Sequence, residues 1–212
     1  MRKSVFLMVG VALLIMGSTA PQAEDETVAE TSYVCLGCHG ENADGVQDLG
    51  APRLAGQYAD YLTEQTINFR DGKRGYAPED ARGSDMRVSV DGLSDEHIIA
   101  LSAYFEKLET PFADPVNALG DMAAGKQIYE GNCASCHGYA AKGSMAVYAP
   151  NLAILSPWYI KDQMRAYQNG WRGGDDSTTR AKFMRSIARQ VTTPKQLDDL
   201  VAYIASLRDE PS

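Results

Sequence analysis

Apolar residues recur at helical spacing in several segments of this chain, and no segment shows the strict alternation expected of a half-buried strand. Two of these segments, 58–71 and 94–107, lie in the first half of the chain, and two more, 156–169 and 193–207, lie in the second half. Residues 123–132 form a shorter segment of the same kind. The pattern predicts an all-α protein.

Residues that start or stop helices stand at the ends of these segments. Gly72 and Gly170 follow the first segment of each half and favour helix termination there. Ser156 is a predicted N-cap, and the proline that follows it suits the first helical turn. Ser94 is another predicted N-cap, and residues 193–196, Thr-Pro-Lys-Gln, have the form of a capping box.

The chain contains one pattern twice. Two CxxCH motifs, at 35–39 and 133–137, lie 98 residues apart, and a shift of 98 residues aligns the chain with itself from Cys35 to Arg87 without a gap. The aligned pairs include Pro52 and Pro150, Tyr61 and Tyr159, Gln65 and Gln163, Arg74 and Arg172, and Met86 and Met184. Because this period is much longer than that of a solenoid, we predict two similar domains.

The CxxCH motif is the attachment site of c-type haem, in which the cysteines form thioethers with the vinyl groups and the histidine binds the iron. The residues assigned to these roles are Cys35, Cys38 and His39 for one haem, and Cys133, Cys136 and His137 for the other. Two alternatives stay open, a pair of disulfides in an exported protein and a structural zinc site. Neither requires a histidine after each cysteine pair, so we favour two covalent haems.

The repeat also nominates a second ligand for each iron. Met86 and Met184 both lie 47 residues after the motif histidine, and methionine opposite histidine is common in electron-transfer haem proteins. The alternative for any methionine is that it fills a hydrophobic core. That alternative suits Met164, which lies on the apolar face of a predicted helix. We therefore predict that Met86 and Met184 are axial ligands.

The N-terminus has the features of an export signal. Two basic residues precede an apolar stretch from Ser4 to Met16, and small or polar residues follow as far as Ala23. The apolar stretch is shorter than the about 20 residues that span a bilayer, which favours cleavage over an uncleaved membrane anchor, the alternative reading. We assign residues 1–23 to a signal peptide.

The remaining chain divides into three parts. We assign residues 24–110 to domain 1, residues 111–120 to a linker with two prolines, and residues 121–212 to domain 2. Domains of roughly 90 residues are small for self-sufficient hydrophobic cores. We therefore expect the folding of each domain to depend on its haem.

The chain is acidic. Removal of the signal takes away two of 20 basic side chains and none of 28 acidic ones. Such a balance argues against a nucleic-acid partner, which requires a basic face. It favours attraction to a basic patch on a redox partner, although solubility alone would also explain it.

The order of these elements resembles the class I cytochrome c fold, in which a helix, the CxxCH motif, a proline loop, a middle helix, a methionine loop and a final helix follow one another. The segment Pro52–Gln57 and the residues Leu93-Ser94-Asp95 after Met86 are similar to the di-haem "c-four" cytochromes of bacterial respiratory chains. Domain 2 departs from this pattern at residues 154–156. The resemblance implies two tandem class I cytochrome c domains, each wrapped around one covalent haem.

The resemblance also implies roles for the residues around each haem. The carbonyls of Pro52 and Pro150 would accept a hydrogen bond from the ligating histidines, because a metal-bound histidine needs an acceptor for its other ring nitrogen. Arg74 and Arg172 would pair with haem propionates, unless they lie at solvated helix ends. His97 has no histidine counterpart in domain 2, and we expect it at the surface.

Tyr61 and Tyr159 have two interpretations of equal weight. Each tyrosine could pack on its haem or bind a propionate, and each could instead belong to the hydrophobic core. Their equivalent positions in the two repeats predict the same role for both.

These observations predict an electron carrier with two haems and no catalytic site, since a methionine and a histidine fill both axial positions of each iron. The resemblance implies a periplasmic protein, with peripheral membrane association allowed, that takes electrons from a quinol-oxidising complex and delivers them to a haem–copper terminal oxidase. The alternative is a haem subunit of a periplasmic dehydrogenase. An enzyme such as a peroxidase or a thiosulfate-oxidising cytochrome would require one iron to lose its methionine.

Overall fold

The computed structural model describes residues 22–109, 111 and 119–208, and they are mostly helical. Domain 1 consists of α1 (Gln22–His39), α2 (Ala59–Arg70), α3 (Ala81–Ser89) and α4 (Asp95–Lys107). Domain 2 consists of α5 (Met122–Asn132), α6 (Ala134–His137), the 3-10 turn η1 (Met145–Val147), α7 (Pro157–Asn169), α8 (Thr179–Ala188) and α9 (Pro194–Ser206). The prediction of an all-α protein is confirmed.

Two predicted segments fall largely outside the described residues. Only Gln22 and Ala23 of the predicted signal peptide are described, and both belong to α1. Residues 112–118, most of the predicted linker, also lie outside the described part. Within the described residues, no helix combines the length and the apolar character needed to cross a bilayer.

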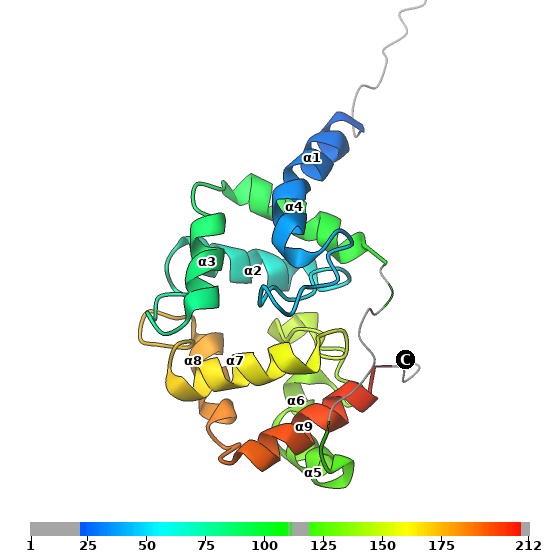
Figure 1. Ribbon diagram of the computed structural model, residues 1–212, viewed down its shortest axis with the longest axis vertical. Coiled ribbons are helices and arrows are strands. Elements are labelled where there is room, and N and C mark those ends of the chain that lie inside the picture. The colour runs from blue at the N-terminus through cyan, green and yellow to red at the C-terminus, as the bar shows by residue number, and fades with distance from the viewer. Residues whose placement is uncertain (1–21, 110, 112–118, 209–212) are drawn as a thin grey trace, which may run out of the picture.

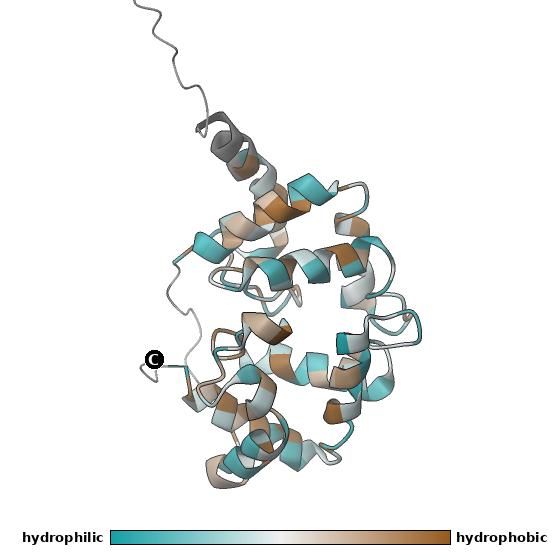
Figure 2. Cartoon of the chain, turned by 180° about the vertical axis from the view of Figure 1, so that it is seen from behind, coloured by the Kyte–Doolittle hydropathy of each residue, from teal (hydrophilic) through white to brown (hydrophobic). Residues whose placement is uncertain are grey.

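The two domains are stacked on each other (Figure 1). In domain 1, α4 packs against both α1 and α2, and α2 also contacts α3. In domain 2, α9 packs closely against α5 and also contacts α7, which lies beside α8. Figure 2 shows polar and apolar residues on the same helices, as expected where one side of each helix faces a core. The helices α2 and α7 bring the two domains together.

The helix ends follow the sequence signals. The side chain of Ser94 accepts a hydrogen bond from the backbone N–H of His97, and Thr193 and Gln196 form the predicted capping box of α9. Gly170 ends α7 in the left-handed conformation, with φ of 79°. These predicted boundaries are confirmed.

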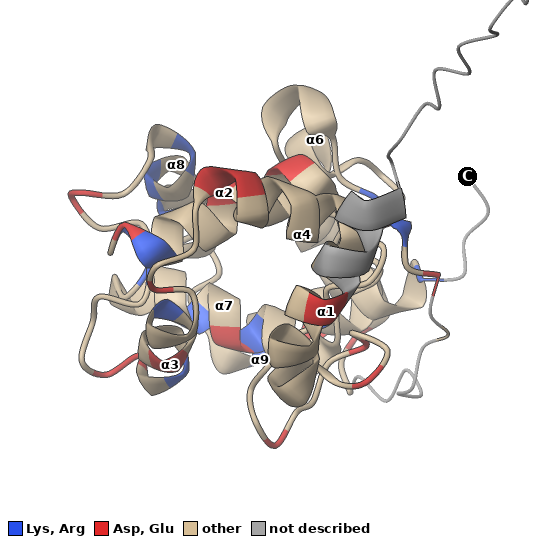
Figure 3. Ribbon diagram, turned by 90° about the horizontal axis from the view of Figure 1, so that it is seen from above, with Lys and Arg blue, Asp and Glu red and all other residues tan. Residues whose placement is uncertain are grey.

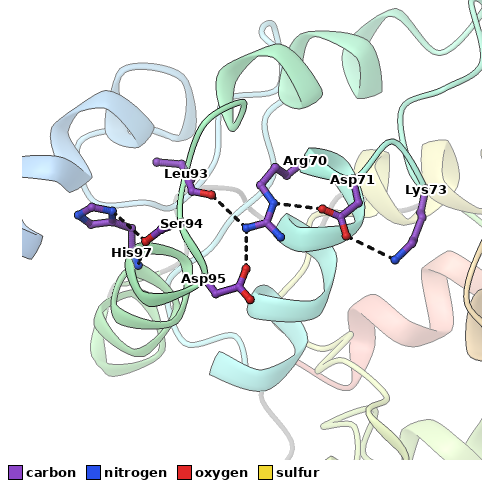
Figure 4. A network of polar contacts seen from close by, with 7 residues as sticks. All are labelled: Arg70, Asp71, Lys73, Leu93, Ser94, Asp95 and His97. Carbon is purple, nitrogen blue, oxygen red and sulfur yellow. Dashed lines mark hydrogen bonds and ion pairs between the residues drawn. The ribbon is translucent and has the colours of Figure 1, made fainter.

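A cluster of polar contacts joins the end of α2 to the start of α4 (Figure 4). Arg70 donates to the carbonyl of Leu93 and to the carboxylate of Asp95, at 3.0 and 2.6 Å. Asp71 accepts from the same arginine at 3.1 Å. His97 lies at the exposed side of this cluster, so its predicted place at the surface is confirmed.

The segments that carry the matched methionines differ from the expected loops. Met86 lies in α3 and Met184 lies in α8. The side chain of Asp80 accepts a hydrogen bond from the N–H of Gly83, and that of Thr178 accepts from Ala181. These N-caps satisfy backbone donors at the helix starts, which explains why the chain forms helices where a loop was expected.

The helices before the CxxCH motifs differ between the domains. The helix α1 continues without a break through the motif to His39, whereas α5 ends at Asn132 and α6 starts afresh at Ala134. In α5, a Cβ atom at Gly125 would overlap the backbone carbonyl of Asp199 in α9. This glycine therefore permits the close contact between α5 and α9.

Candidate haem sites and the domain interface

Each motif histidine is fixed by a proline carbonyl. His39 Nδ1 lies 2.7 Å from the carbonyl oxygen of Pro52, and His137 Nδ1 lies 3.2 Å from that of Pro150. Because a carbonyl oxygen only accepts, Nδ1 must donate, and Nε2 keeps its lone pair. Burial lowers the pKa of both histidines, an effect that the hydrogen bond to the carbonyl opposes. The resulting neutral imidazole is the form that binds a metal.

A tight loop after each motif places the proline. The N–H of Gly45 donates to the carbonyl of His39 at 2.8 Å, and the N–H of Gly143 donates to that of His137 at 2.8 Å. Both glycines have positive φ, and a Cβ atom at Gly45 would lie 2.7 Å from the backbone nitrogen of Arg53. The loop can therefore bring its proline back beneath the histidine only with glycine at this position.

The four cysteines of the CxxCH motifs are free thiols in this structure. Burial raises the pKa of Cys35, and it raises that of Cys133 to about 11. Reactive dithiol motifs instead have a lowered pKa. Among the described residues, no group of three or more histidine, cysteine or acidic side chains is arranged to hold a metal ion.

A cavity of about 790 Å³, a size within the usual range of ligand sites, is lined by domain 1 and by residues of α7 in domain 2. Both predicted axial ligands, His39 and Met86, line it together with Cys38. The remaining predicted residues of domain 1 that line the cavity are Pro52, Tyr61 and Arg74. The structure thus brings most of the predicted site residues of domain 1 around one space.

The site residues of domain 2 are arranged around its hydrophobic core. His137 is buried, and Met184 packs against a buried cluster that includes Cys133. Met164 belongs to the same cluster, which confirms its predicted role as a core residue.

The predicted arginines lie between the two domains. Arg74 and Arg172 are both buried, so the alternative of a solvated helix end is wrong. Arg74 donates to Gln163 at 2.8 Å and to the hydroxyl of Tyr159 at 3.0 Å, both in domain 2. Each arginine therefore contacts the other domain as well as its own.

The equivalent contacts of domain 2 reach in the opposite direction. Arg172 donates to Gln65 at 2.7 Å and to the hydroxyl of Tyr61 at 3.2 Å, both in domain 1. Gln65 and Gln163 also accept from the arginine of their own domain, at 3.1 and 2.8 Å. The four equivalent contacts make the centre of the interface self-complementary, as in a two-fold symmetric dimer.

Two ion pairs repeat this symmetry at the edge of the interface. Arg82 pairs with Asp162 at 2.6 Å, and Arg180 pairs with Glu64 at 2.8 Å. The two arginines are 98 residues apart in the sequence, and so are the two acidic residues, as the repeat requires. Sequence reasoning missed these four residues, although their equal spacing was a usable signal.

The centre of the interface suits an anionic group. Among the described residues, no acidic side chain pairs with Arg74 or Arg172, although buried charges normally have a counter-charge. Burial alone would raise the pKa of Tyr61, but the two nearby arginines lower it overall. The cavity that Arg74 lines is continuous with this centre, since Tyr159 and Gln163 also line it. The carboxylate groups of a haem fit these residues.

A CxxCH motif with an anchored histidine and an equivalent methionine in each of two helical domains defines a di-haem electron-transfer protein. A sequence model of the cytochrome c family matches residues 27–109 and 122–208. The chain therefore belongs to the cytochrome c family. It is a di-haem class I cytochrome c with two covalently bound haem c groups.

Similar proteins differ in their roles. The thiosulfate dehydrogenase electron acceptor of Stutzerimonas stutzeri (strain A1501) is 30% identical over 85% of this chain and 87% of its own. The cytochrome c4 structure of Acidithiobacillus ferrooxidans superimposes with a TM-score of 0.66 and 27% identity over 82% of this chain and 99% of that one. The oxidase subunit FixP of Sinorhizobium medicae (strain WSM419) is 36% identical over 63% of this chain and 46% of its own.

Proposed function

We propose that Cys35 and Cys38 attach one haem and Cys133 and Cys136 the other. His39 and Met86 then serve as axial ligands in domain 1, and His137 and Met184 do so in domain 2. The observation that carries this assignment is that His39 and Met86, far apart in sequence, line one cavity with Cys38, while the repeat supplies the same residues in domain 2.

The residues of the chain then define what the protein does. When bound, each haem supplies one-electron oxidation and reduction at its iron. The carbonyls of Pro52 and Pro150 hold the histidines in one orientation, and Arg74 and Arg172 would supply positive charge to the haem carboxylates. Because a histidine and a methionine would both bind each iron, no coordination position would remain for a substrate. The protein is therefore a carrier and not an enzyme.

The carrier works in the periplasm and passes electrons from a quinol-oxidising complex to a haem–copper terminal oxidase. The signal-like N-terminus supports export, and the similarity to cytochrome c4 and to an oxidase subunit supports a respiratory role. Its association with the membrane, if any, is peripheral or through an uncleaved N-terminus.

The test is oxygen uptake driven by quinol in membranes from cells that lack this chain. Purified holoprotein is expected to restore the uptake, whereas a Cys35→Ala/Cys38→Ala variant, which cannot attach the first haem, is not. Uptake that is unaffected by deletion of the chain, or by its addition, would contradict the respiratory role.

A second candidate is an electron-accepting partner of a periplasmic dehydrogenase. The relative from Stutzerimonas stutzeri, named as an electron acceptor of thiosulfate dehydrogenase, favours it. Purification at low salt distinguishes the two functions. A co-purifying dehydrogenase that reduces the haems on addition of thiosulfate, without a quinol-oxidising complex, supports this second candidate.

A further inference from the structure

The surfaces beside the two matched methionines carry opposite charge. Residues 75–92, which include Met86, contain four acidic and two basic side chains, whereas residues 173–190, which include Met184, contain two acidic and four basic ones. The same contrast extends over the family-matched domains. Residues 27–109 carry 15 acidic and 7 basic side chains, and residues 122–208 carry 6 acidic and 11 basic ones.

At two positions domain 2 exposes an aromatic side chain that domain 1 lacks. Phe183, next to Met184, is 59% exposed, and its counterpart is Asp85. Tyr148 is 40% exposed, and its counterpart is Gly50. Exposed aromatic residues near a redox centre are typical of a docking surface, because aromatic side chains are enriched at protein interfaces.

These exposed residues form one surface. The guanidinium of Arg180 lies 4.4 Å from the centre of the Tyr148 ring, which joins the end of η1 to α8. Phe183 lies about one turn after Arg180 in α8, so the two side chains are neighbours on one side of the helix. Lys182, Phe183 and Arg180 are all exposed. We name the five residues Val147, Tyr148, Arg180, Lys182 and Phe183 the α8 surface. Figure 3 shows the basic residues of α8.

The α8 surface itself contains two basic and no acidic side chains, although acidic groups lie nearby. Glu64 of domain 1 pairs with Arg180, and Asp175 and Asp176 precede the N-cap of α8. Within the described part of the chain, no acidic side chain forms an ion pair with Lys182. An apolar centre beside a basic side chain complements an acidic face with apolar residues of its own.

We propose that the α8 surface is a docking site for a redox protein whose own docking face is acidic, and that electrons cross there beside Met184. The proposal rests on the proposed function as a di-haem carrier. Domain 1, with its acidic surface, cannot offer the same docking site, so the two domains select partners of opposite charge.

Electron transfer from two small redox proteins to the purified oxidised holoprotein tests this proposal. Reduced rubredoxin serves as the acidic donor and reduced mitochondrial cytochrome c as the basic one, each giving one electron to a ferric haem. The Lys182→Ser/Phe183→Asp variant receives the residues that domain 1 has at these positions. At low salt its second-order rate with rubredoxin should fall by about tenfold, because electrostatic steering is lost. Its rate with mitochondrial cytochrome c should not fall.

A matched variant provides the control. Ser84→Lys/Asp85→Phe makes the reverse exchange in domain 1 and leaves the α8 surface intact. It should retain the full rate with rubredoxin and lose rate with mitochondrial cytochrome c. A rubredoxin rate that stays within about twofold in the domain 2 variant, or an equal loss with both donors, would overturn the proposal.

A second variant separates docking from misfolding. Tyr148 has φ of 55° and its counterpart Gly50 has φ of 66°, so Tyr148→Gly removes the aromatic ring without backbone strain. The rubredoxin rate should fall by roughly threefold, a moderate interface effect, with both reduction potentials unchanged. An unchanged rate in this variant speaks against the α8 surface.

Sedimentation of the protein alone at low salt tests whether a second copy of this chain, and not another redox protein, binds at the α8 surface. A monomer supports the proposal, whereas head-to-tail association that Lys182→Ser/Phe183→Asp abolishes would replace the acidic redox protein by a second copy. These measurements use purified proteins, so their failure leaves the membrane assay of the proposed function unaffected. Quinol-driven uptake that does not depend on this chain, together with intact rubredoxin docking, would identify failure of the proposed function instead.

Discussion

Domains 1 and 2 are alike at the centre of their interface and different on the surfaces beside the matched methionines. The inward pairs Tyr61 and Tyr159, Gln65 and Gln163, and Arg74 and Arg172 are identical in the two repeats. Exposed positions differ in charge, as at Ser84 and Lys182, or in polarity, as at Asp85 and Phe183. In a self-complementary interface each residue contacts the other copy, so a change on one side disturbs both sides. The outer surfaces lack this constraint.

This difference changes the interpretation of the net charge. The acidic excess of the whole chain suggested one acidic surface that attracts a basic partner, but of the two family-matched regions only residues 27–109 carry an acidic excess. Residues 122–208 carry more basic than acidic side chains. A whole-chain charge therefore hides two domains with opposite preferences for their partners.

Haem attachment gives the sharpest test of whether the two domains act as separate units. Cys35→Ala/Cys38→Ala should remove the haem of domain 1 only, and Cys133→Ala/Cys136→Ala that of domain 2 only, because each motif serves its own domain. Denaturing mass spectrometry should show the chain with one haem in both variants. Loss of both haems from either variant would show that the domains do not mature independently.

Ligand exchange should change one reduction potential at a time. Met86→His and Met184→His replace a thioether by imidazole, which lowers the potential of the affected haem by a sizeable part of the ~0.8 V range that axial ligands span. Potentiometric titration should resolve one shifted and one nearly unchanged haem in each variant. Met164→Leu is the control, since Met164 is a core residue and its replacement should shift neither potential.

The buried arginines should have equal effects on stability. Arg74→Gln and Arg172→Gln each remove several hydrogen bonds to a charged group, so each should lower the free energy of unfolding of the holoprotein by about 3 kcal/mol. Arg87→Gln, at an exposed position next to Met86, should change it little. Urea unfolding measures all three, and a large effect of only one buried arginine would contradict the symmetric interface.

A smaller effect is expected from packing that occurs in domain 2 alone. Gly125→Ala places a methyl group against the carbonyl of Asp199 and should cost about 1–3 kcal/mol of stability. Gly131→Ala, in the same helix, meets no atom within 4 Å and should be neutral or slightly stabilising. Thermal unfolding followed by circular dichroism compares them. Equal melting temperatures would show that α5 does not depend on this close contact with α9.

Most of the architecture could be predicted from the sequence because the relevant signals are local. Apolar spacing and caps such as Ser94 and Thr193 act within one or two turns, and the structure confirms the helices that they predict. The exception is α3 and α8, where the resemblance implied loops. The local N-caps Asp80 and Thr178 were a usable signal for these helices.

The sequence by itself determined two helical domains, two haem-attachment motifs and the equivalence of their residues, since covalent chemistry and a 98-residue repeat are visible without coordinates. Only the tertiary structure decided where those residues meet. It placed His39 and Met86 around one cavity and crossed Arg74 and Arg172 into opposite domains. Such contacts depend on how two folded surfaces pack together, and that packing is set by the sum of many weak interactions between residues distant in sequence.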